Sequence, residues 1–407
     1  MRQFPDTTET IGVFVDQLPM NSMTPEQIEF ASRHYAGTQK LTSSQAALLR
    51  AHNPDFIVLH YRLGLRQSDP RVKHIHDDAW GNDWDAIGSS DPHNLWIYTN
   101  DRTVPLYRLL GGGAREYVAD LSKPYWQDYW AKAVIAEANA CNSDGVFADS
   151  CHPPTGIPQH LAEDSLLGKP PYTGYDYCAQ LDKWFDFVYP KLQAAGLYLI
   201  PNVAGFNTGW DKTTGYYSQC DGVFVEGFGI TNNDWRMQAE RTLRAIGTDN
   251  IYIAQCDMDI TYAEARMWYL ANFLLLKNKH SFVNMRAFDS FHWLPEYDLN
   301  IGRAISEPII TDPLGICSRE YQRATVLVNP TSSDQPWTII EDDDCFTDCQ
   351  RYATLLFSGG GHVGPDGVVP TAAVTAMSCS LKLLLPPWTA AIVVRQCDWD
   401  RGEIWKS

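Results

Sequence analysis

Two carboxylates at the ends of a repeated hexapeptide are the residues whose types and spacing best suit chemistry. The string Asp-Gly-Val-Phe-Ala-Asp occupies positions 144–149, and Asp-Gly-Val-Phe-Val-Glu follows 77 residues later at 221–226. In each copy Asp-Gly predicts a turn, Val-Phe predicts a buried strand, and Asp149 or Glu226 falls at the strand's carboxyl end. Two carboxylates facing one pocket are typical of glycoside cleavage, in which one protonates the leaving oxygen and the other attacks or stabilises the oxocarbenium-like centre.

The residues that follow the two carboxylates favour different protonation states. Glu226 precedes Gly-Phe-Gly, an apolar setting that favours a protonated acid, so we expect it to be the acid/base. Asp149 precedes Ser-Cys-His, a more polar setting that favours an ionised nucleophile. The alternative is that either acid is a buried partner of a basic residue such as Arg62 or Arg286.

Other polar and aromatic residues near the expected strand ends are candidates for substrate binding. Polar side chains there would hydrogen-bond sugar hydroxyls, and tryptophan rings would cover apolar sugar faces, although a tryptophan can equally belong to the core. The candidates are Asp16, Arg62, Trp80, Trp84, Asn202, Trp210, Asp257, Arg286 and His292.

One segment is unusually rich in residues that could bind either a sugar or a metal. Residues 74–93 contain three His, two Trp and five Asp. A metal site is the alternative there, but we expect a solvated loop whose two tryptophans contact substrate. Residues 341–344 are Glu-Asp-Asp-Asp and lack the alternating spacing of a calcium loop, so we expect a surface turn. The sequence therefore predicts neither a metal nor a cofactor.

The elements that must position these residues alternate between strands and helices. Continuous apolar runs, typical of parallel strands buried on both faces, occur at 11–15, 56–60, 95–98, 145–148, 197–201, 222–225, 251–254 and 282–285. Helical patterns occur at 25–33, 123–140, 175–195, 234–246 and 261–278. This alternation predicts an α/β fold, a (β/α)₈ TIM barrel over residues 8–315, and not an open sheet, because the first strand lacks a glycine-rich phosphate turn.

After about residue 315 the alternation of strand and helix patterns ends. Short strand-like runs are separated by turn clusters, as expected for a C-terminal antiparallel, β-sandwich-like domain over residues 318–397. We expect its strands at 323–329, 337–341, 352–357, 380–385 and 389–395.

Composition excludes several classes of protein. Among 407 residues, 32 basic against 49 acidic side chains give a net charge of −17, which disfavours nucleic acid and anionic membranes as partners. No apolar run approaches the roughly 18 residues of a membrane span. The ten cysteines show no zinc spacing, and free thiols or disulfides both stay open. The first residues show no signal peptide; we expect a secreted or extracytoplasmic protein whose leader is absent from this sequence, with a cytoplasmic location as the alternative.

The two hexapeptides, together with the aromatic segment Pro124-Tyr-Trp-Gln-Asp-Tyr-Trp130, resemble a known group of enzymes. The chain is similar, over about residues 10–310, to the hypothetical family-15-like set of (β/α)₈ glycoside hydrolases and to glycoside hydrolase family 114, the endo-α-galactosaminidases. The resemblance implies a nucleophile on the fourth strand and an acid/base on the sixth, hence Asp149 and Glu226. It also implies a retaining enzyme acting on an α-linked oligo- or polysaccharide.

A catalytically inactive carbohydrate-binding barrel is the competing interpretation. It differs from a glycosidase in whether Asp149 and Glu226 face one pocket and are needed for turnover. In either case we expect a carbohydrate ligand. The sequence does not indicate an oligomeric state.

Overall fold

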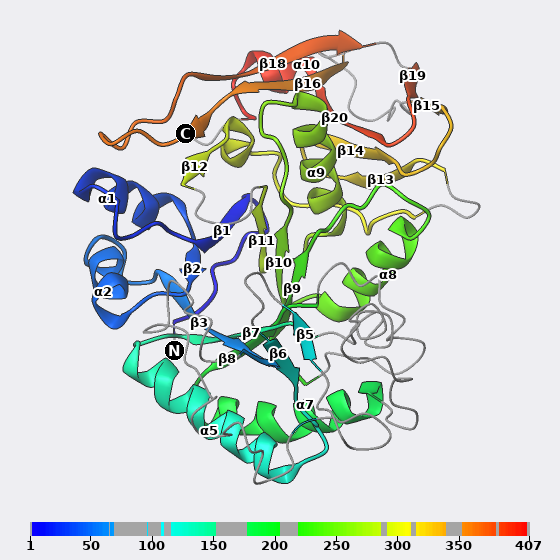
Figure 1. Ribbon diagram of the computed structural model, residues 1–407. Helices are drawn as coiled ribbons and strands as arrows, with labels where there is room; N and C mark the ends of the chain where they lie inside the picture. The colour runs from blue at the N-terminus through cyan, green and yellow to red at the C-terminus, as the bar shows by residue number, and fades with distance from the viewer. Residues whose placement is uncertain are drawn as a thin grey trace. The chain divides into compact units, whose positions relative to one another are not determined.

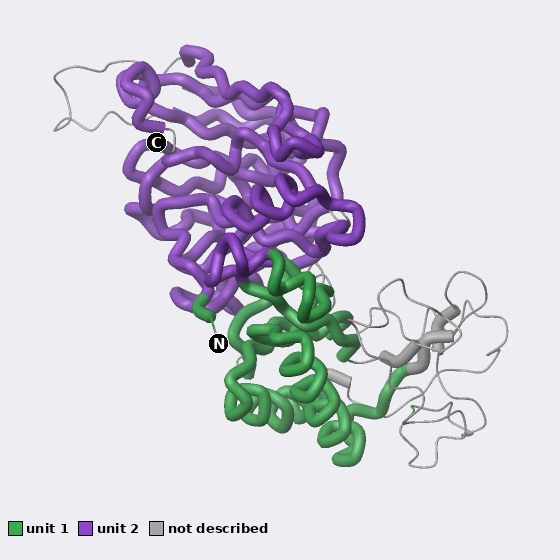
Figure 2. The backbone as a smooth tube through the Cα atoms, turned by 90° about the vertical axis from the view of Figure 1, so that its left-hand side faces the viewer, with its two compact units in different colours: residues 1–3, 38–48, 57–224 green, residues 4–37, 49–56, 225–407 purple. Residues whose placement is uncertain are grey.

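The computed structural model describes residues 2–64, 66–68, 96, 107–109, 115–151, 177–203, 219–285, 291–310, 315–338, 352–379 and 382–404. These residues belong to two compact units (Figure 2). The first unit comprises Met1–Gln3, Thr38–Leu48 and Ile57–Phe224, and the second comprises Phe4–Gly37, Leu49–Phe56 and Val225–Ser407.

Eight strands form one sheet with the topology of a (β/α)₈ barrel, which confirms the predicted fold class. Their order is β8-β7-β3-β2-β1-β11-β10-β9, the chain order of the eight strands taken around a ring. Its two end strands meet in the first unit, where Asn202, just after β8, forms a parallel bridge to Phe224 of β9. The strands are β1 (Gly12–Gln17), β2 (Gly37–Gln39), β3 (Ile57–Leu63), β7 (Gly145–Asp149), β8 (Tyr198–Pro201), β9 (Gly222–Glu226), β10 (Ile251–Gln255) and β11 (Ser281–Asn284) (Figure 1).

The second and third barrel strands differ from the prediction. The second strand is β2, which has only the three residues Gly-Thr-Gln and therefore gave no apolar pattern. The strand predicted at 95–98 is not in the barrel sheet: Trp96, its one described residue, forms an antiparallel bridge with Ala119. It lies along the chain among β4 (Arg66–Ser68), β5 (Tyr107–Leu109) and β6 (Arg115–Val118), which form a small antiparallel sheet. Within 95–98 the described residues show β pairing at Trp96 alone, and a short apolar run does not show which segment it pairs with.

Tryptophans fix the helices of the first unit. Helix α5 (Pro124–Ala140) begins with the aromatic segment singled out above, and it packs against α7 (Tyr177–Ala194). The rings of Trp130 and Trp184 meet edge to face at 4.7 Å, and both are fully buried. The indole of Trp130 also donates a 2.8 Å hydrogen bond to the carbonyl of Leu63 at the end of β3. The aromatic segment therefore anchors α5 to a barrel strand.

Helices α1 (Pro25–His34), α8 (Trp235–Ile246) and α9 (Ala263–Leu276) of the second unit follow the predicted pattern. In α1, Thr24 is the N-cap: its hydroxyl accepts from the amide of Gln27, whose side chain accepts in return. Helix α2 (Ser43–His52), which has residues in both units, was not predicted, because its apolar residues are mostly consecutive, without helical spacing, and it opens with two serines. Helices α8 and α9 agree with the predicted ranges to within two residues.

The C-terminal region is antiparallel, as predicted. A five-stranded sheet has the order β13-β14-β20-β16-β18, and β15 pairs with β19 in a second sheet. Edge strands β13 and β18 were not predicted; β18 alternates between exposed and half-buried small residues, so it lacks an apolar run. The strands are β13 (Cys317–Glu320), β14 (Ala324–Asn329), β15 (Gln335–Thr338), β16 (Tyr352–Gly359), β17 (Gly361–His362), β18 (Ala372–Cys379), β19 (Lys382–Leu385) and β20 (Thr389–Arg395), followed by α10 (Gln396–Asp400).

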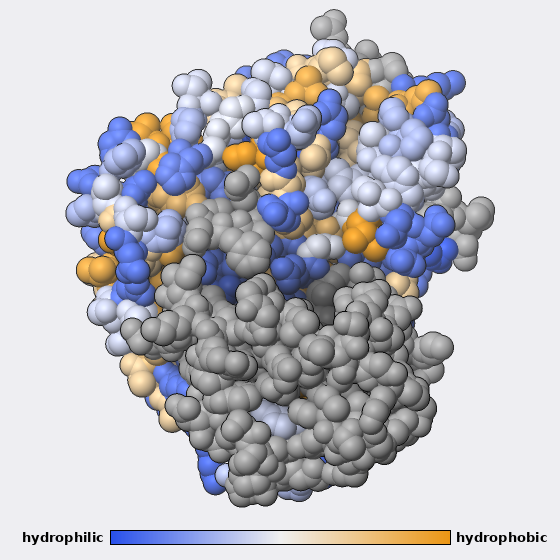
Figure 3. Space-filling model, viewed as in Figure 1, coloured by the Kyte–Doolittle hydropathy of each residue, from blue (hydrophilic) through white to orange (hydrophobic). Residues whose placement is uncertain are grey.

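Helix α9 belongs to the core of the second unit. Ten of its fourteen residues are buried, including all those from Leu270 to Leu276, and it packs against β13, β14, β16 and β20. Within the described residues, no helix is long and apolar enough to cross a membrane. Hydrophobic and hydrophilic residues are interspersed on the described part of the surface in Figure 3.

Candidate active site

The opening aspartates of the two hexapeptides have the same structural role. The carboxylate of Asp144 accepts a 3.0 Å hydrogen bond from the amide of Val58, whose carbonyl accepts from the amide of Asp144 at 2.8 Å. Asp221 exchanges the equivalent two bonds with Leu199, at 2.8 and 3.1 Å. Each aspartate thus joins the start of its strand to the preceding barrel strand. The recurrence of Asp-Gly at the start of both hexapeptides is therefore explained by the hydrogen bonds that join neighbouring strands, and it needs no catalytic role.

Aromatic contacts identify the inner face of the strands in the first unit. The rings of Phe147 on β7 and Phe224 on β9 meet edge to face at 4.8 Å, and Tyr61 on β3 stacks on Phe147 at 5.8 Å. Because side chains alternate along a strand, Asp149 shares the face of Phe147, and Glu226 shares the face of Phe224. Each carboxylate therefore ends its strand on the face that carries these rings.

Asp149 is held by three hydrogen-bond donors of the first unit. Its Oδ2 accepts from the hydroxyl of Tyr61 at 2.6 Å. Its Oδ1 accepts from the side-chain amide of Asn202 at 2.9 Å and from the backbone amide of Ser150 at 2.7 Å. Ser150 has a φ of 57°, a left-handed conformation that non-glycine residues adopt rarely and that is frequent at functional sites. These donors come from β3, from β7's own end and from the end of β8, so three parts of the barrel orient one carboxylate.

A lysine that was not predicted lies beside this group. Lys40 directly follows β2, is 6% exposed and has a φ of 66°. Its ammonium lies over the ring of Tyr61, 4.9 Å from the centroid, within the range of a cation–π contact. Lys40 was not predicted because it follows a three-residue strand without an apolar pattern. Tyr61 was not predicted because a continuous apolar run does not show which face of β3 points to Asp149.

Arg62 lies on the opposite face of β3 from Tyr61. Its guanidinium contacts Glu137 of α5 at 2.6 and 2.5 Å, and His60, two residues earlier, contacts the same carboxylate at 3.0 Å. Burial raises the pKa of Glu137, but the hydrogen bond of His60 and the charge of Arg62 outweigh it, so the net shift is downward. A role for Arg62 in substrate binding stays a prediction.

In the second unit, Glu226 ends β9 with its side chain partly exposed. The turn that follows is fixed by Gln238 of α8, whose amide oxygen accepts from the backbone of Gly229 at 2.7 Å and whose amide nitrogen donates to the carbonyl of Gly227 at 3.1 Å. Gly227 itself has a φ of 74°, which suits glycine. Phe228 between them is buried against Tyr269. The two hydrogen bonds of the buried Gln238 therefore fix the turn that follows Glu226.

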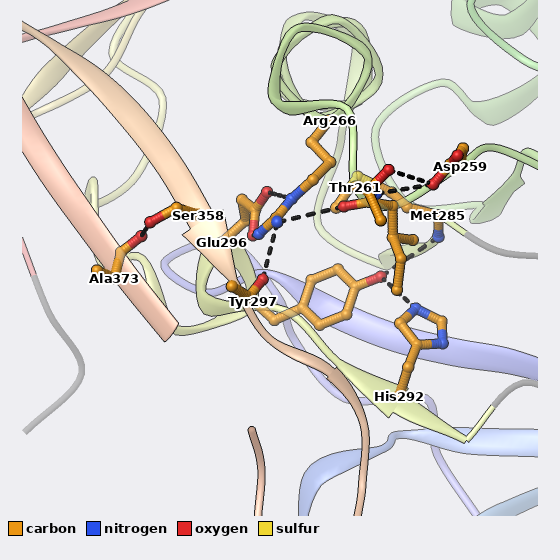
Figure 4. Close-up of polar contacts among 11 residues, drawn as sticks. Asp259, Thr261, Arg266, Met285, His292, Glu296, Tyr297, Ser358 and Ala373 are labelled. Atoms are coloured by element: carbon orange, nitrogen blue, oxygen red, sulfur yellow. Dashed lines mark hydrogen bonds and ion pairs between the residues drawn. The ribbon is translucent and has the colours of Figure 1, made fainter. Parts of the chain in front are cut away.

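The remaining candidates have different environments. Asp16 is buried near the end of β1, and Asp257 is exposed just after β10. His292, in β12 (His292–Trp293), is buried and contacts the hydroxyl of Tyr297 through Nε2 at 3.4 Å (Figure 4). Trp80, Trp84, Trp210 and Arg286 lie outside the described residues, as do segments 74–93 and 341–344. Within the described ranges, no group of three His, Cys, Asp or Glu side chains could hold a metal ion.

Comparison with known proteins supplies a family. The model of a family described as hypothetical glycosyl hydrolase family 15 matches residues 50–325. Among curated protein sequences no match was found.

Several solved structures are similar at low sequence identity. A cycloisomaltooligosaccharide glucanotransferase of Paenibacillus sp. is 10% identical with a TM-score of 0.44, and the match covers 96% of this chain and 55% of that one. A maltogenic alpha-amylase of Thermotoga neapolitana is 9% identical, with a TM-score of 0.44 and coverage of 94% and 98%. An alpha-amylase of Malbranchea cinnamomea is 8% identical, with a TM-score of 0.41 and coverage of 97% and 96%.

Proposed function

Because the chain belongs to the hypothetical glycosyl hydrolase family 15, we propose that it is a retaining glycosidase with Asp149 as nucleophile and Glu226 as acid/base. Its substrate in this proposal is an α-linked oligo- or polysaccharide. The observation that carries the proposal is that both carboxylates end barrel strands, on the strand faces that carry Phe147 and Phe224. Active sites of (β/α)₈ enzymes lie at the carboxyl ends of the strands.

The proposed reaction has two steps. In the first, an oxygen of Asp149 bonds to the anomeric carbon while the bond to the leaving oxygen breaks, and Glu226 gives its proton to that oxygen. In the second, water loses a proton to Glu226 as its oxygen bonds to the anomeric carbon, and the bond to Asp149 breaks. Two inversions give net retention. The atoms and charges of the two steps balance with the protein, the substrate and one water molecule.

The roles divide between the two acids on grounds of their surroundings. Asp149 accepts hydrogen bonds from three donors, which orient an ionised carboxylate. Glu226 precedes a turn whose Phe228 is buried, and apolar surroundings favour a carboxyl that can carry a proton. A retaining enzyme requires the two carboxyl groups to be about 5–5.5 Å apart, whereas an inverting enzyme requires about 6.5–9.5 Å.

The α configuration rests on the resemblance of the two hexapeptides to those of the endo-α-galactosaminidases. A panel of 4-nitrophenyl α- and β-glycosides of glucose, galactose and N-acetylgalactosamine, together with defined α-linked oligosaccharides, tests it. Turnover confined to α-linked members supports the proposal, and turnover confined to β-linked members overturns the configuration. Binding without turnover across the panel supports the alternative, an inactive carbohydrate-binding barrel.

Substitutions test the two roles. Asp149→Asn is expected to lower turnover by about 10⁴-fold, because the amide cannot attack. Glu226→Gln is expected to lower turnover of 4-nitrophenyl substrates by about 10²–10⁴-fold, but to lower the first step far less with 2,4-dinitrophenyl substrates, whose leaving group needs no proton. Proton NMR of the first-formed anomer reports retention or inversion. Near wild-type turnover in both variants would exclude the assignment.

A further inference from the structure

The hydrogen bonds to Asp149 distinguish its two oxygens. A carboxylate has about four lone-pair positions, two on each oxygen. Within the described residues, Oδ1 accepts two hydrogen bonds, from Asn202 and Ser150, and Oδ2 accepts one, from Tyr61. A position that could face the anomeric carbon is therefore left on Oδ2 only.

Tyr61 is well fixed for holding that oxygen. Its ring stacks on Phe147, and its backbone pairs with Phe147 in the register of β3 with β7. The hydroxyl reaches Oδ2 at 2.6 Å, the usual distance for a hydroxyl that donates to an ionised carboxylate. Both residues belong to the first unit, so their arrangement is a property of one compact part of the protein.

The ammonium of Lys40 acts on the same phenol from its face. It lies 4.9 Å from the ring centroid, and the residue is almost fully buried, so little water screens its field. A positive charge over a phenol withdraws electron density from it and makes its hydroxyl a stronger donor. Lys40 is thus placed to strengthen the bond from Tyr61 to Asp149.

We propose that Oδ2 of Asp149 is the attacking oxygen and that Tyr61, polarised by Lys40, is the positioning residue that holds it. This inference rests on the proposed function. In the first step Oδ2 bonds to the anomeric carbon while the leaving oxygen takes the proton of Glu226. In the second step the bond from the anomeric carbon to Oδ2 breaks. The hydroxyl of Tyr61 donates to the oxygen on which the negative charge returns, and it keeps its proton throughout.

Single-turnover kinetics at a fixed pH test the inference, with a 2,4-dinitrophenyl glycoside that the wild-type protein hydrolyses. At saturating substrate the rate constant reports bond formation by Asp149, because this leaving group needs no proton, and the half-saturating concentration reports binding. Tyr61→Phe retains the ring and its stacking, so the rate constant is expected to fall by about tenfold while the half-saturating concentration changes little. Lys40→Met is expected to lower the rate constant by a smaller factor, and Lys40→Arg to restore it.

The double variant separates the action of Lys40 through Tyr61 from a direct action on Asp149. If Lys40 acts through the phenol hydroxyl, Lys40→Met has little further effect in the Tyr61→Phe background. Equal effects of Lys40→Met in both backgrounds, or single-turnover rate constants equal to that of the wild type, would overturn the inference. Asp149→Asn is measured in parallel: if that variant keeps turnover, the proposed function itself fails. A chain without glycosidase activity would overturn both.

Discussion

Asp144 and Asp149 lie five positions apart at the two ends of β7. Asp144 stabilises the fold, whereas Asp149 is the proposed nucleophile. Asp144 is 2% exposed, joins β7 to β3 and also accepts from the backbone and guanidinium of Arg2 at 3.2 and 3.1 Å. Asp149 is partly exposed at the other end of the strand. The sequence places both correctly at the two ends of a strand. It does not distinguish them, because the difference lies in which neighbours each carboxylate meets after folding.

Substituting each of the two separates stability from activity. Asp144→Asn is expected to lower the free energy of unfolding by about 1–3 kcal/mol, since a buried backbone amide and Arg2 lose a charged acceptor, while the folded fraction keeps its turnover. Asp149→Asn is the matched control and is expected to lose turnover with a smaller change in stability. Urea unfolding followed by circular dichroism, beside a turnover assay, measures both. An Asp144→Asn protein that is stable but inactive would contradict this division.

Glu137 gives a pH dependence with a definite sign. Its pKa is lowered in the folded protein relative to the usual 4.5, so the ion pair with Arg62 stabilises the fold above about pH 4.5 and that contribution is lost as the pH falls below it. We expect Glu137→Gln to lower the unfolding free energy by about 1–2 kcal/mol at pH 7, and to lose less stability than the wild type between pH 5 and pH 3. Urea unfolding at several pH values measures this. Parallel curves for the two proteins would contradict it.

Among elements, helix α9 connects four strands of the C-terminal sheet to the 3₁₀ helix η2 (Pro295–Asp298). Arg266 on α9 makes two 2.5 Å bonds to Glu296 of η2 and donates to the carbonyl of Gly359 at the end of β16 at 2.8 Å (Figure 4). Both side chains are almost fully buried. The segment Leu270–Leu276 of α9, which is apolar except for Asn272, was predicted as part of a helix. Its burial on nearly all sides depends on sheets formed about 50–130 residues later, which periodicity does not show.

Removing one charge of the Arg266–Glu296 pair is expected to destabilise the fold. Glu296→Gln leaves the guanidinium of Arg266 buried without its counter-charge, so we expect the unfolding free energy to fall by about 3–5 kcal/mol. The exposed pair Arg236–Glu240, also within the second unit, is the control, and Glu240→Gln is expected to cost no more than about 0.5 kcal/mol. Chemical denaturation of the two variants tests this. Equal losses would show that burial does not determine the strength of these pairs.

For the whole molecule, the barrel fold and seven of its eight strands were predictable because they rest on apolar runs, and the antiparallel C-terminal region was predictable from its turn clusters. The positions of Asp149 and Glu226 at strand ends were predictable because each ends such a run, and their catalytic roles stay proposals. Lys40 follows a strand of three residues that has no apolar pattern. Tyr61 and Arg62 are adjacent in sequence, and only the folded strand β3 shows that Tyr61 is the one that contacts Asp149. The domain bounds stay proposals, with residues 8–315 as the catalytic barrel and 318–397 as the β-domain. Secretion of the protein also stays a proposal.

The C-terminal strands are expected to be required for folding of the barrel's seventh repeat, which consists of β10 and α9. Arg319 of β13 donates to the carbonyls of Leu275 and Lys277 at the end of α9, and the hydroxyl of Tyr321 donates to that of Leu274 at 2.6 Å. A fragment of residues 1–315 would expose the apolar residues of α9. We expect it to lack a cooperative thermal transition and to bind a hydrophobic dye. A fragment that melts cooperatively and retains turnover would contradict this expectation.

Trapping the covalent intermediate tests the central claim most directly. A 2-deoxy-2-fluoroglycosyl fluoride of the sugar that the protein hydrolyses slows the second step, so the glycosyl group accumulates on the nucleophile. Peptide mass spectrometry then locates the added mass, with Asp149→Asn protein as the control. The account predicts one label per chain, on Asp149, and none on the Asn variant. A label on Glu226 or another residue, or inverted product without any label, would contradict it.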